Sequence, residues 1–257
     1  MVLLLAGKAE VGFDQTDRTC WMTHIVAHRG DRAHAPENTR RAFEAALAAG
    51  AEMLEMDLRL SADGTVMVFH DDVLDSLTSE RGALRERSAA ELAGVAVLPD
   101  RHPAGEDSTI PTLARVLEEF GGRTDLYLEL KDLGRDNATL ARAVLDLVPA
   151  DSPHVLASFD AELLSLCLEA GRPTVWIAAN AKALRQHPHR LEGLHAMSLR
   201  HDQWDAASRD AVLERGVQPW AWTVNDRRSW CRLQRMGLDA ICTDDPGAAR
   251  SWREECR

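Results

Sequence analysis

Amphipathic and apolar stretches alternate along this chain in one recurring order. The amphipathic stretch Thr39–Ala49 ends at Gly50, and the apolar run EMLEMDL follows it. A glycine just past a helix end adopts the left-handed conformation at little cost, so it typically marks a helix terminus. The same order recurs around four further glycines, Gly121, Gly171, Gly216 and Gly237. This pattern predicts amphipathic helices that alternate with buried strands.

Eight apolar runs predict the strands of one parallel sheet. Strands that alternate with helices form right-handed βαβ units, which build α/β folds. Eight strands without a linker in 257 residues predict a single (β/α)8 TIM barrel, which typically needs about 250 residues. A doubly wound open sheet is the alternative, but no GxGxxG motif follows the first strand. The predicted strands are Ile25–His28, Met53–Leu58, Leu126–Lys131, Val155–Ser158, Thr174–Ala178, Ala196–Leu199, Gln218–Thr223 and Ala240–Thr243.

The interval between the second and third predicted barrel strands, Arg59–Asp125, is longer than a βα unit needs. It begins with Asp63 and Gly64 between strand-like runs, which is a hairpin signal. A polar stretch with one short helix near Ser88–Gly94 follows. We interpret residues 59–110 as a small insertion after the second barrel strand, over the barrel mouth, where loops usually shape ligand sites.

Residues 1–22 precede the first predicted strand and do not continue the alternating pattern. We interpret them as an N-terminal extension and residues 23–257 as one barrel domain that contains the insertion. Because Met22 leads directly into the first strand, we expect residues 1–21 to be dispensable for folding and activity.

Charge and hydropathy limit the classes of partner. The chain carries 41 acidic and 30 basic residues, which gives a net charge of −11. This balance argues against nucleic acid or an anionic membrane, although a local basic pocket can still hold a phosphate. No apolar stretch reaches the ~20 residues that a membrane span needs, so we expect no stable membrane insertion. Nothing in the pattern indicates an oligomeric state.

The cysteines are odd in number and never spaced CxxC. This usage predicts neither a disulfide framework nor a zinc cluster, and it favours a reducing, cytoplasmic compartment. Two of them, Cys167 and Cys242, lie in apolar runs and are expected in the core. The five positions are Cys20, Cys167, Cys231, Cys242 and Cys256.

Carboxylates occupy alternate positions in two predicted strands. Glu55 and Asp57 lie two residues apart and therefore share a face, and Glu129 and Lys131 repeat this spacing. Strands of a parallel barrel are covered on both faces, so paired carboxylates there must meet a specific partner. Three carboxylates form an all-oxygen ligand set that suits one divalent cation, Mg²⁺ or Ca²⁺, with Mn²⁺ as a further candidate. An ion network with Lys131 or an arginine is the competing interpretation.

Two histidines complete the candidate site. His28 and Arg29 end the first predicted strand, where barrel active sites lie. His70 ends the return strand of the hairpin, and a two-residue or a four-residue turn places it opposite Asp57 or Glu55. Two histidines can exchange protons with the attacking and leaving oxygens, while a cation, Arg29 and Lys131 stabilise charge on a phosphorus centre.

Several motifs occur in a fixed order between about residues 24 and 246. They are HRGDRAHAPENT, ExD at Glu55–Asp57, SADGTVMVFHDD, IPTL at Ile110–Leu113, ELK at Glu129–Lys131, SF at Ser158–Phe159, WTVN at Trp222–Asn225 and TDDP at Thr243–Pro246. In this order they resemble the glycerophosphodiester phosphodiesterase family. The resemblance implies a TIM barrel with a small insertion and a divalent cation.

The resemblance also implies a role for each matching residue. Glu55, Asp57 and Glu129 are the implied metal ligands, and His28 and His70 the implied acid–base pair. Arg29 and Lys131 are the implied phosphate contacts. Phe159 and Trp222 are candidates for lining the glycerol or the head-group side of the substrate, with barrel filling as the alternative. Glu37 and Asn38 are expected to cap or brace the helix after Thr39, with orientation of Arg29 as the alternative. Asn225, Asp244 and Asp245 are expected at helix starts.

The expected activity is hydrolysis of a small glycerophosphodiester to sn-glycerol 3-phosphate and an alcohol. Either a water or the substrate's own glycerol hydroxyl attacks phosphorus, and the sequence leaves both routes open. A lysophospholipase D on the same barrel is the second enzyme hypothesis. A catalytically silent barrel that only binds phosphate-bearing ligands is the hypothesis from another class.

Overall fold

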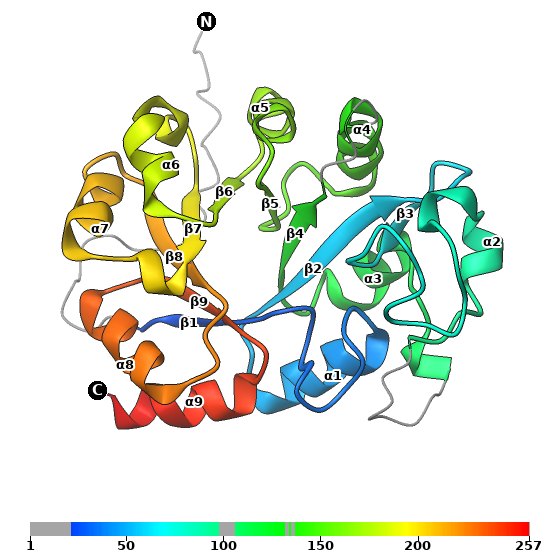
Figure 1. Cartoon of the computed structure of the whole chain (residues 1–257), viewed down its shortest axis with the longest axis horizontal. Helices are drawn as coiled ribbons and strands as arrows, with labels where there is room; N and C mark the ends of the chain where they lie inside the picture. Colours follow the sequence, from blue (N-terminus) through cyan, green and yellow to red (C-terminus); the bar gives the residue numbers. More distant parts are fainter. Residues whose placement is uncertain (1–21, 98–105, 132–133, 135–136, 257) are drawn as a thin grey trace, which may run out of the picture.

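The computed structural model describes residues 22–97, 106–131, 134 and 137–256. Eight parallel strands form a closed barrel in which β1 pairs with both β2 and β9. Helices surround this barrel (Figure 1), which confirms the predicted TIM-barrel fold. The barrel strands are β1 (His24–Ala27), β2 (Met53–Leu60), β4 (Asp125–Leu130), β5 (Val155–Ser158), β6 (Thr174–Ala178), β7 (Ala196–Arg200), β8 (Gln218–Trp222) and β9 (Ala240–Thr243).

The helices begin and end where their terminal residues satisfy the backbone. Thr39 accepts a hydrogen bond from the Ala42 amide at the start of α1, and Gly50 ends this helix with a φ of 93°. Gly237 ends α8 in the same way, with a φ of 79°. The outer helices are α1 (Arg40–Ala49), α3 (Leu113–Phe120), α4 (Asn137–Leu147), α5 (Ala161–Glu169), α6 (Ala181–Gln186), α7 (Ala206–Leu213), α8 (Arg227–Met236) and α9 (Pro246–Glu255).

Alternation along β2 separates the apolar core from the site. Leu54, Met56 and Leu58 belong to the cluster that packs under α1 and α3, and all three are fully buried. Because successive strand residues point to opposite faces, Glu55 and Asp57 point into the barrel instead. A single strand therefore supplies both packing and two interior carboxylates.

The insertion follows β2 and has a small core of its own. It contains β3 (Val66–Val68) and α2 (Ala89–Leu92), and Figure 1 shows it on one side of the barrel. Its core is the cluster Met67, Phe69, Leu74, Leu84, Leu92, Val97 and Ile110. The division into extension, barrel and insertion stays a prediction, since residues 1–21 lie outside the described residues.

The hairpin between β2 and β3 has a register that differs from both expected ones. Leu58 pairs with Val68 and Leu60 with Val66, and the Ser61 amide donates to the Thr65 carbonyl at 3.0 Å. Three residues therefore form the turn, and Gly64 takes the left-handed conformation with a φ of 77°. The expected two-residue and four-residue turns are both wrong.

The structure joins Cys231 in α8 to Cys256 after α9 by a disulfide, with their Cα atoms 5.2 Å apart. The expectation that the cysteines form no disulfide is wrong for this pair. Cys167 and Cys242 are free and buried, as predicted. Disulfides are rare in reducing compartments, so the cytoplasmic location stays a prediction.

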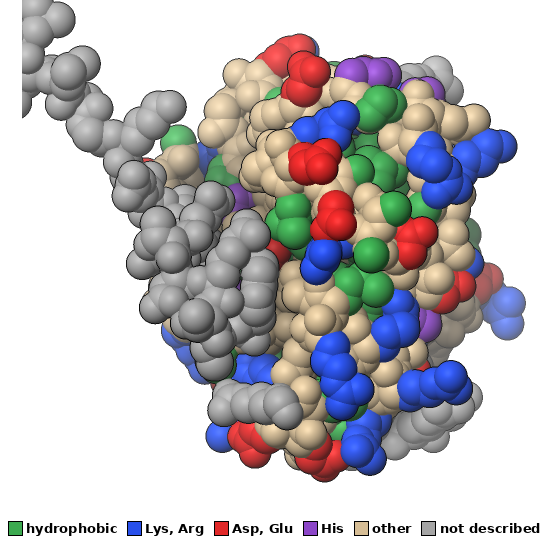
Figure 2. Space-filling model, turned by 90° about the vertical axis from the view of Figure 1, so that its left-hand side faces the viewer, with side chains coloured by type: hydrophobic (Ala, Val, Ile, Leu, Met, Phe, Trp, Pro, Cys, Tyr) green, Lys and Arg blue, Asp and Glu red, His purple; other side chains and the backbone are tan. Residues whose placement is uncertain are grey.

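In the described part of the chain, no helix is long and apolar enough to cross a membrane. Figure 2 shows one face of the molecule, on which acidic and basic side chains both occur around small hydrophobic areas. This face is thus mixed in charge rather than uniformly basic.

Candidate active site

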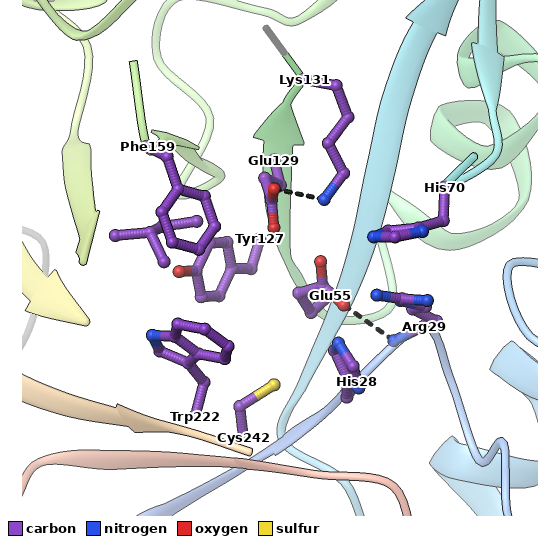
Figure 3. Close-up of a pocket in the computed structure, with 11 residues that line it drawn as sticks. His28, Arg29, Glu55, His70, Tyr127, Glu129, Lys131, Phe159, Trp222 and Cys242 are labelled. Carbon is purple, nitrogen blue, oxygen red and sulfur yellow. Dashed lines mark hydrogen bonds and ion pairs between the residues drawn. The ribbon is translucent and has the colours of Figure 1, made fainter. Parts of the chain in front are cut away.

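A cavity of about 250 Å³ opens at the carboxyl ends of the barrel strands. Charged groups from β1, β2, β4 and the insertion line one side of it, and apolar side chains from β5, β6, β8 and β9 line the other (Figure 3). Active sites of TIM barrels lie at this end. The lining residues are His28, Arg29, Glu55, His70, Tyr127, Glu129, Lys131, Phe159, Ile177, Trp222 and Cys242.

Three buried carboxylates form the centre of the charged side. One oxygen from each of Glu55, Asp57 and Glu129 lies within 4.8 Å of the other two. Glu55 Oε2 accepts a hydrogen bond from the Arg29 amide at 2.8 Å, whereas Oε1 is buried without a hydrogen-bond partner among the described residues. Burial and the charges of Asp57 and Glu129 raise the pKa of Glu55 well above its usual value. An orphaned oxygen among repelling carboxylates fits a bound cation.

Asp57 has a different environment from Glu55, although both lie on β2. It is fully buried, and Lys131 Nζ at 2.7 Å, Arg29 Nε at 3.0 Å and Asn38 Nδ2 at 2.7 Å surround it. Burial alone favours the neutral acid, but Lys131 and Arg29 outweigh it and hold the pKa of Asp57 far below its usual value. Lys131 also pairs with Glu129. The predicted ion network is therefore present around Asp57. It does not satisfy Glu55, whose Oε1 has no hydrogen-bond partner among the described residues.

The turn that carries Arg29 has an unusual backbone. Arg29 and Asn38 both have positive φ, 58° and 56°, and the Asn38 amide donates to the Arg29 carbonyl at 2.9 Å. Gly30 follows with a φ of 84°, and a Cβ there would lie 2.6 Å from the backbone of Ala42. Positive φ in residues other than glycine costs free energy and is concentrated at functional sites.

The side chain of Arg29 is held by carboxylates rather than by solvent. Its Nη1 donates to Glu37 Oε1 at 2.7 Å, and Glu37 Oε2 also pairs with Arg32 at 2.9 Å. Thr39 is the residue that caps α1, so the expectation that Glu37 caps this helix is wrong. Glu37 orients Arg29 instead. Asn38 braces Asp57. The guanidinium is thus fixed at the cavity wall, where it can meet a phosphate.

His28 and His70 lie on either side of Arg29 in the view of Figure 3. His28 Nδ1 lies 2.7 Å from Asp244 Oδ1, and His70 Nδ1 lies 2.5 Å from Asp71 Oδ1. Burial is the main cause that lowers the pKa of both histidines below the ordinary value. Each ring therefore has one nitrogen held by a carboxylate, which leaves the other for a ligand.

His70 reaches the cavity for a reason other than the one expected. With the observed register, a continued strand would place His70 opposite Met56, on the face away from Glu55. However, β3 ends at Val68, and the last ladder contact is the Phe69 amide to the Asp57 carbonyl at 2.9 Å. The chain leaves the ladder there, and His70 lines the cavity. The predicted location is correct, and the register argument for it is wrong.

Sequence reasoning missed the two aspartates that contact the histidines. Asp71 directly follows His70, and Asp244 lies 216 positions beyond His28. Asp244 was expected to start a helix, but Asp245 does so by accepting the Ala248 amide at 2.8 Å. A usable signal existed, because β1 and β9 are neighbours in the predicted barrel and both residues directly follow these strands.

Phe159 and Trp222 form an aromatic corner across the cavity from the charged groups. Their ring centroids lie 5.4 Å apart and the rings are nearly perpendicular. Phe159 is 44% exposed, and Trp222 donates from Nε1 to the Ser198 carbonyl at 3.2 Å. Both residues line the cavity, so they are more than barrel filling.

Comparison with known proteins identifies the family. The model of the glycerophosphoryl diester phosphodiesterase family matches residues 28–248. A glycerophosphodiester phosphodiesterase of Bacillus subtilis is 32% identical over 243 residues, which cover 86% of this chain and 83% of that protein. A glycerophosphodiester phosphodiesterase of Caldanaerobacter subterraneus is 27% identical over 246 residues, which cover 87% of this chain and 95% of that protein.

Solved structures agree with the sequence comparison. An Oleispira antarctica phosphodiesterase, solved in complex with the product sn-glycerol-3-phosphate, superposes with a TM-score of 0.78 at 25% identity, covering 90% of this chain and 96% of that one. A Thermotoga maritima glycerophosphodiester phosphodiesterase shares the fold with a TM-score of 0.75 at 24% identity. The match covers 90% of this chain and 98% of that one. The chain belongs to the glycerophosphoryl diester phosphodiesterase family.

Proposed function

We propose that this chain hydrolyses small glycerophosphodiesters to sn-glycerol 3-phosphate and an alcohol, with one divalent cation as cofactor. The observation that carries the proposal is the cavity that two carboxylates, two histidines, Arg29 and Lys131 line, with the buried Asp57 next to these carboxylates. The family match and the product complex of the Oleispira antarctica relative support the substrate class.

The chemistry of the carboxylate cluster supports the cation. Glu55, Asp57 and Glu129 would hold it, because among the described residues these three buried carboxyl groups have two cationic side chains beside them, Arg29 and Lys131. Oxygen ligands suit Mg²⁺, Ca²⁺ or Mn²⁺. When bound, such an ion supplies Lewis acidity to a phosphoryl oxygen.

The remaining groups have complementary roles in the proposed reaction. Arg29 and Lys131 hold the negative charge of the phosphodiester. Of His28 and His70, one takes the proton of the attacking oxygen at its free ring nitrogen, and the other donates a proton to the leaving oxygen. The lowered pKa of the histidines favours the neutral ring, which suits the one that acts as the base. Phe159 and Trp222 pack against the alcohol side of the substrate.

A substrate panel tests this proposal. Purified protein with Mg²⁺, Ca²⁺ or Mn²⁺ should release glycerol 3-phosphate from glycerophosphocholine faster than it cleaves lysophosphatidylcholine. Faster cleavage of lysophosphatidylcholine would assign the lysophospholipase D activity instead. Binding without turnover of either compound, with every metal, would indicate the silent barrel.

A further inference from the structure

Polar residues follow three neighbouring strands, and one of these residues, His28, lines the cavity. Asn225 follows β8, Asp244 follows β9 and His28 follows β1. Ala27 pairs with Thr243, and the His28 amide donates to the Thr243 carbonyl at 2.9 Å. His28 and Asp244 are therefore the first residues beyond two paired strands, and the fold brings their side chains together.

The orientation of the Asn225 amide is fixed by the backbone. Its Oδ1 accepts hydrogen bonds from the Asp244 amide at 2.9 Å and from Thr243 Oγ1 at 3.3 Å. Its Nδ2 must then face Asp244, and it donates to Oδ2 at 2.6 Å. One carboxylate oxygen of Asp244 is thus taken by Asn225, and the other lies 2.7 Å from His28 Nδ1.

The charge state of Asp244 decides where the proton of His28 lies. Although burial opposes it, the hydrogen bond and charge of His28 and the charge of Arg32 lower the pKa of Asp244. Arg32 Nη1 lies 3.6 Å from its Oδ1. An ionised carboxylate only accepts hydrogen bonds, so Nδ1 of His28 must carry the hydrogen.

We propose that Asp244, oriented by Asn225, is a positioning residue that fixes His28 with Nδ1 protonated and Nε2 free to exchange a proton with the substrate. The kinetic part of this assignment rests on the proposed phosphodiesterase function, whereas the tautomer of His28 does not. Asp244 is not needed as a helix cap, because another aspartate caps the helix that follows it. Asp245 caps α9, and in the same way Asp226, not Asn225, caps α8.

The variant Asp244→Asn changes the atom that faces His28 and preserves the size of the side chain. The Nδ2 group of Asn225 still needs an acceptor, so the carbonyl of the new amide takes that side and its NH₂ group faces His28. Nδ1 then becomes the acceptor, and the proton moves to Nε2. The matched control is Asp245→Asn, since asparagine is also a good helix N-cap.

Two measurements on the Mg²⁺-saturated protein test the proposal. Nitrogen-15 NMR of the His28 ring reports its tautomer, and steady-state kinetics with glycerophosphocholine report kcat and KM. In the wild-type protein we expect the proton on Nδ1. In Asp244→Asn we expect the proton on Nε2 and a kcat at least ~100-fold lower, the lower end of the usual general acid–base range, with KM changed less than ~3-fold. Asp245→Asn should change neither readout.

Three results would overturn the proposal. They are a wild-type His28 protonated on Nε2, an Asp244→Asn variant with kcat within ~3-fold of wild type, and a loss of kcat with an unchanged tautomer. The first result needs no variant, so it holds even if Asp244→Asn does not fold. If the wild-type protein releases no glycerol 3-phosphate, the proposed function fails, and the tautomer still decides whether Asp244 positions His28.

Discussion

Glu55 should destabilise the metal-free protein, because its carboxyl group is buried there without the cation that it is proposed to bind. It is 3% exposed, with Asp57 and Glu129 as neighbours and one oxygen without a hydrogen-bond partner among the described residues. Glu55→Gln removes the charge and keeps an oxygen that can accept the Arg29 amide. We therefore expect this substitution to stabilise the metal-free protein and to weaken cation binding.

The size of the effect follows from the unsatisfied oxygen. A buried acceptor without a partner costs about 1–3 kcal/mol. For a chain of this length, 1 kcal/mol changes Tm by about 2–4 °C, so Glu55→Gln should raise Tm in chelator by about 2–12 °C. Mg²⁺ at about 100 times its Kd adds about 2.7 kcal/mol to wild type. A ~10-fold weaker site gains only about 1.4 kcal/mol at the same concentration.

Thermal unfolding in chelator and in Mg²⁺ measures both effects on the same samples. Glu52→Gln is the matched control, because Glu52 accepts the Ile25 amide at 2.9 Å and pairs with Arg253 at 2.8 Å. Its substitution should lower Tm in chelator and leave the gain from Mg²⁺ unchanged. If Glu55→Gln lowers Tm in chelator, or gains as much from Mg²⁺ as wild type, the assignment of Glu55 as an underpaired metal ligand is wrong.

Three further predictions concern other parts of the molecule. His70→Ala should lower turnover of glycerophosphocholine by ~10²–10⁴-fold. If His70 is the general acid, a nitrophenyl ester should restore the rate of His70→Ala, because its leaving group needs no proton. If this substrate restores the rate of His28→Ala and not of His70→Ala, His28 is the acid and His70 the base. Despite its burial, contacts with His24, the Ile25 amide and Arg253 lower the pKa of Glu52 to about 2. Its stabilising contribution is therefore present above pH ~4.3, its unfolded value, and is lost as pH falls toward 2. The stability difference between wild type and Glu52→Gln should shrink over that range in urea titrations, and a constant difference would contradict the pairing. Cys256→Ser opens a disulfide loop with a sequence separation of 25 and should cost up to about 3.5 kcal/mol under non-reducing conditions. An unchanged urea midpoint would argue against the bond.

The barrel could be predicted because its determinants are local. Each strand is an apolar run, and two of the preceding helices end at a glycine in the left-handed conformation, Gly50 and Gly237. The carboxylate positions followed from strand alternation along β2, which requires no knowledge of tertiary contacts.

Features that depend on exact register or on distant contacts were not predictable in the same way. The turn after Ser61 has three residues, and the sequence pattern DG is compatible with several turn lengths. The partnership of His28 with Asp244 needs the pairing of β1 with β9, and Asp244 competes with Asp245 for the same helix-start signal. The Cys231–Cys256 bond depends on how α8 packs against α9, which spacing alone does not reveal.

Hydrolysis should depend on one divalent cation that the carboxylate cluster binds. The most direct measurement follows glycerol 3-phosphate release from glycerophosphocholine by chelator-treated protein while Mg²⁺ is added back stepwise. We predict no release in chelator and recovery that saturates with one ion per chain, with at least ~10-fold weaker metal dependence in Glu55→Gln. Full turnover in chelator, or an identical metal dependence in Glu55→Gln, would contradict the claim.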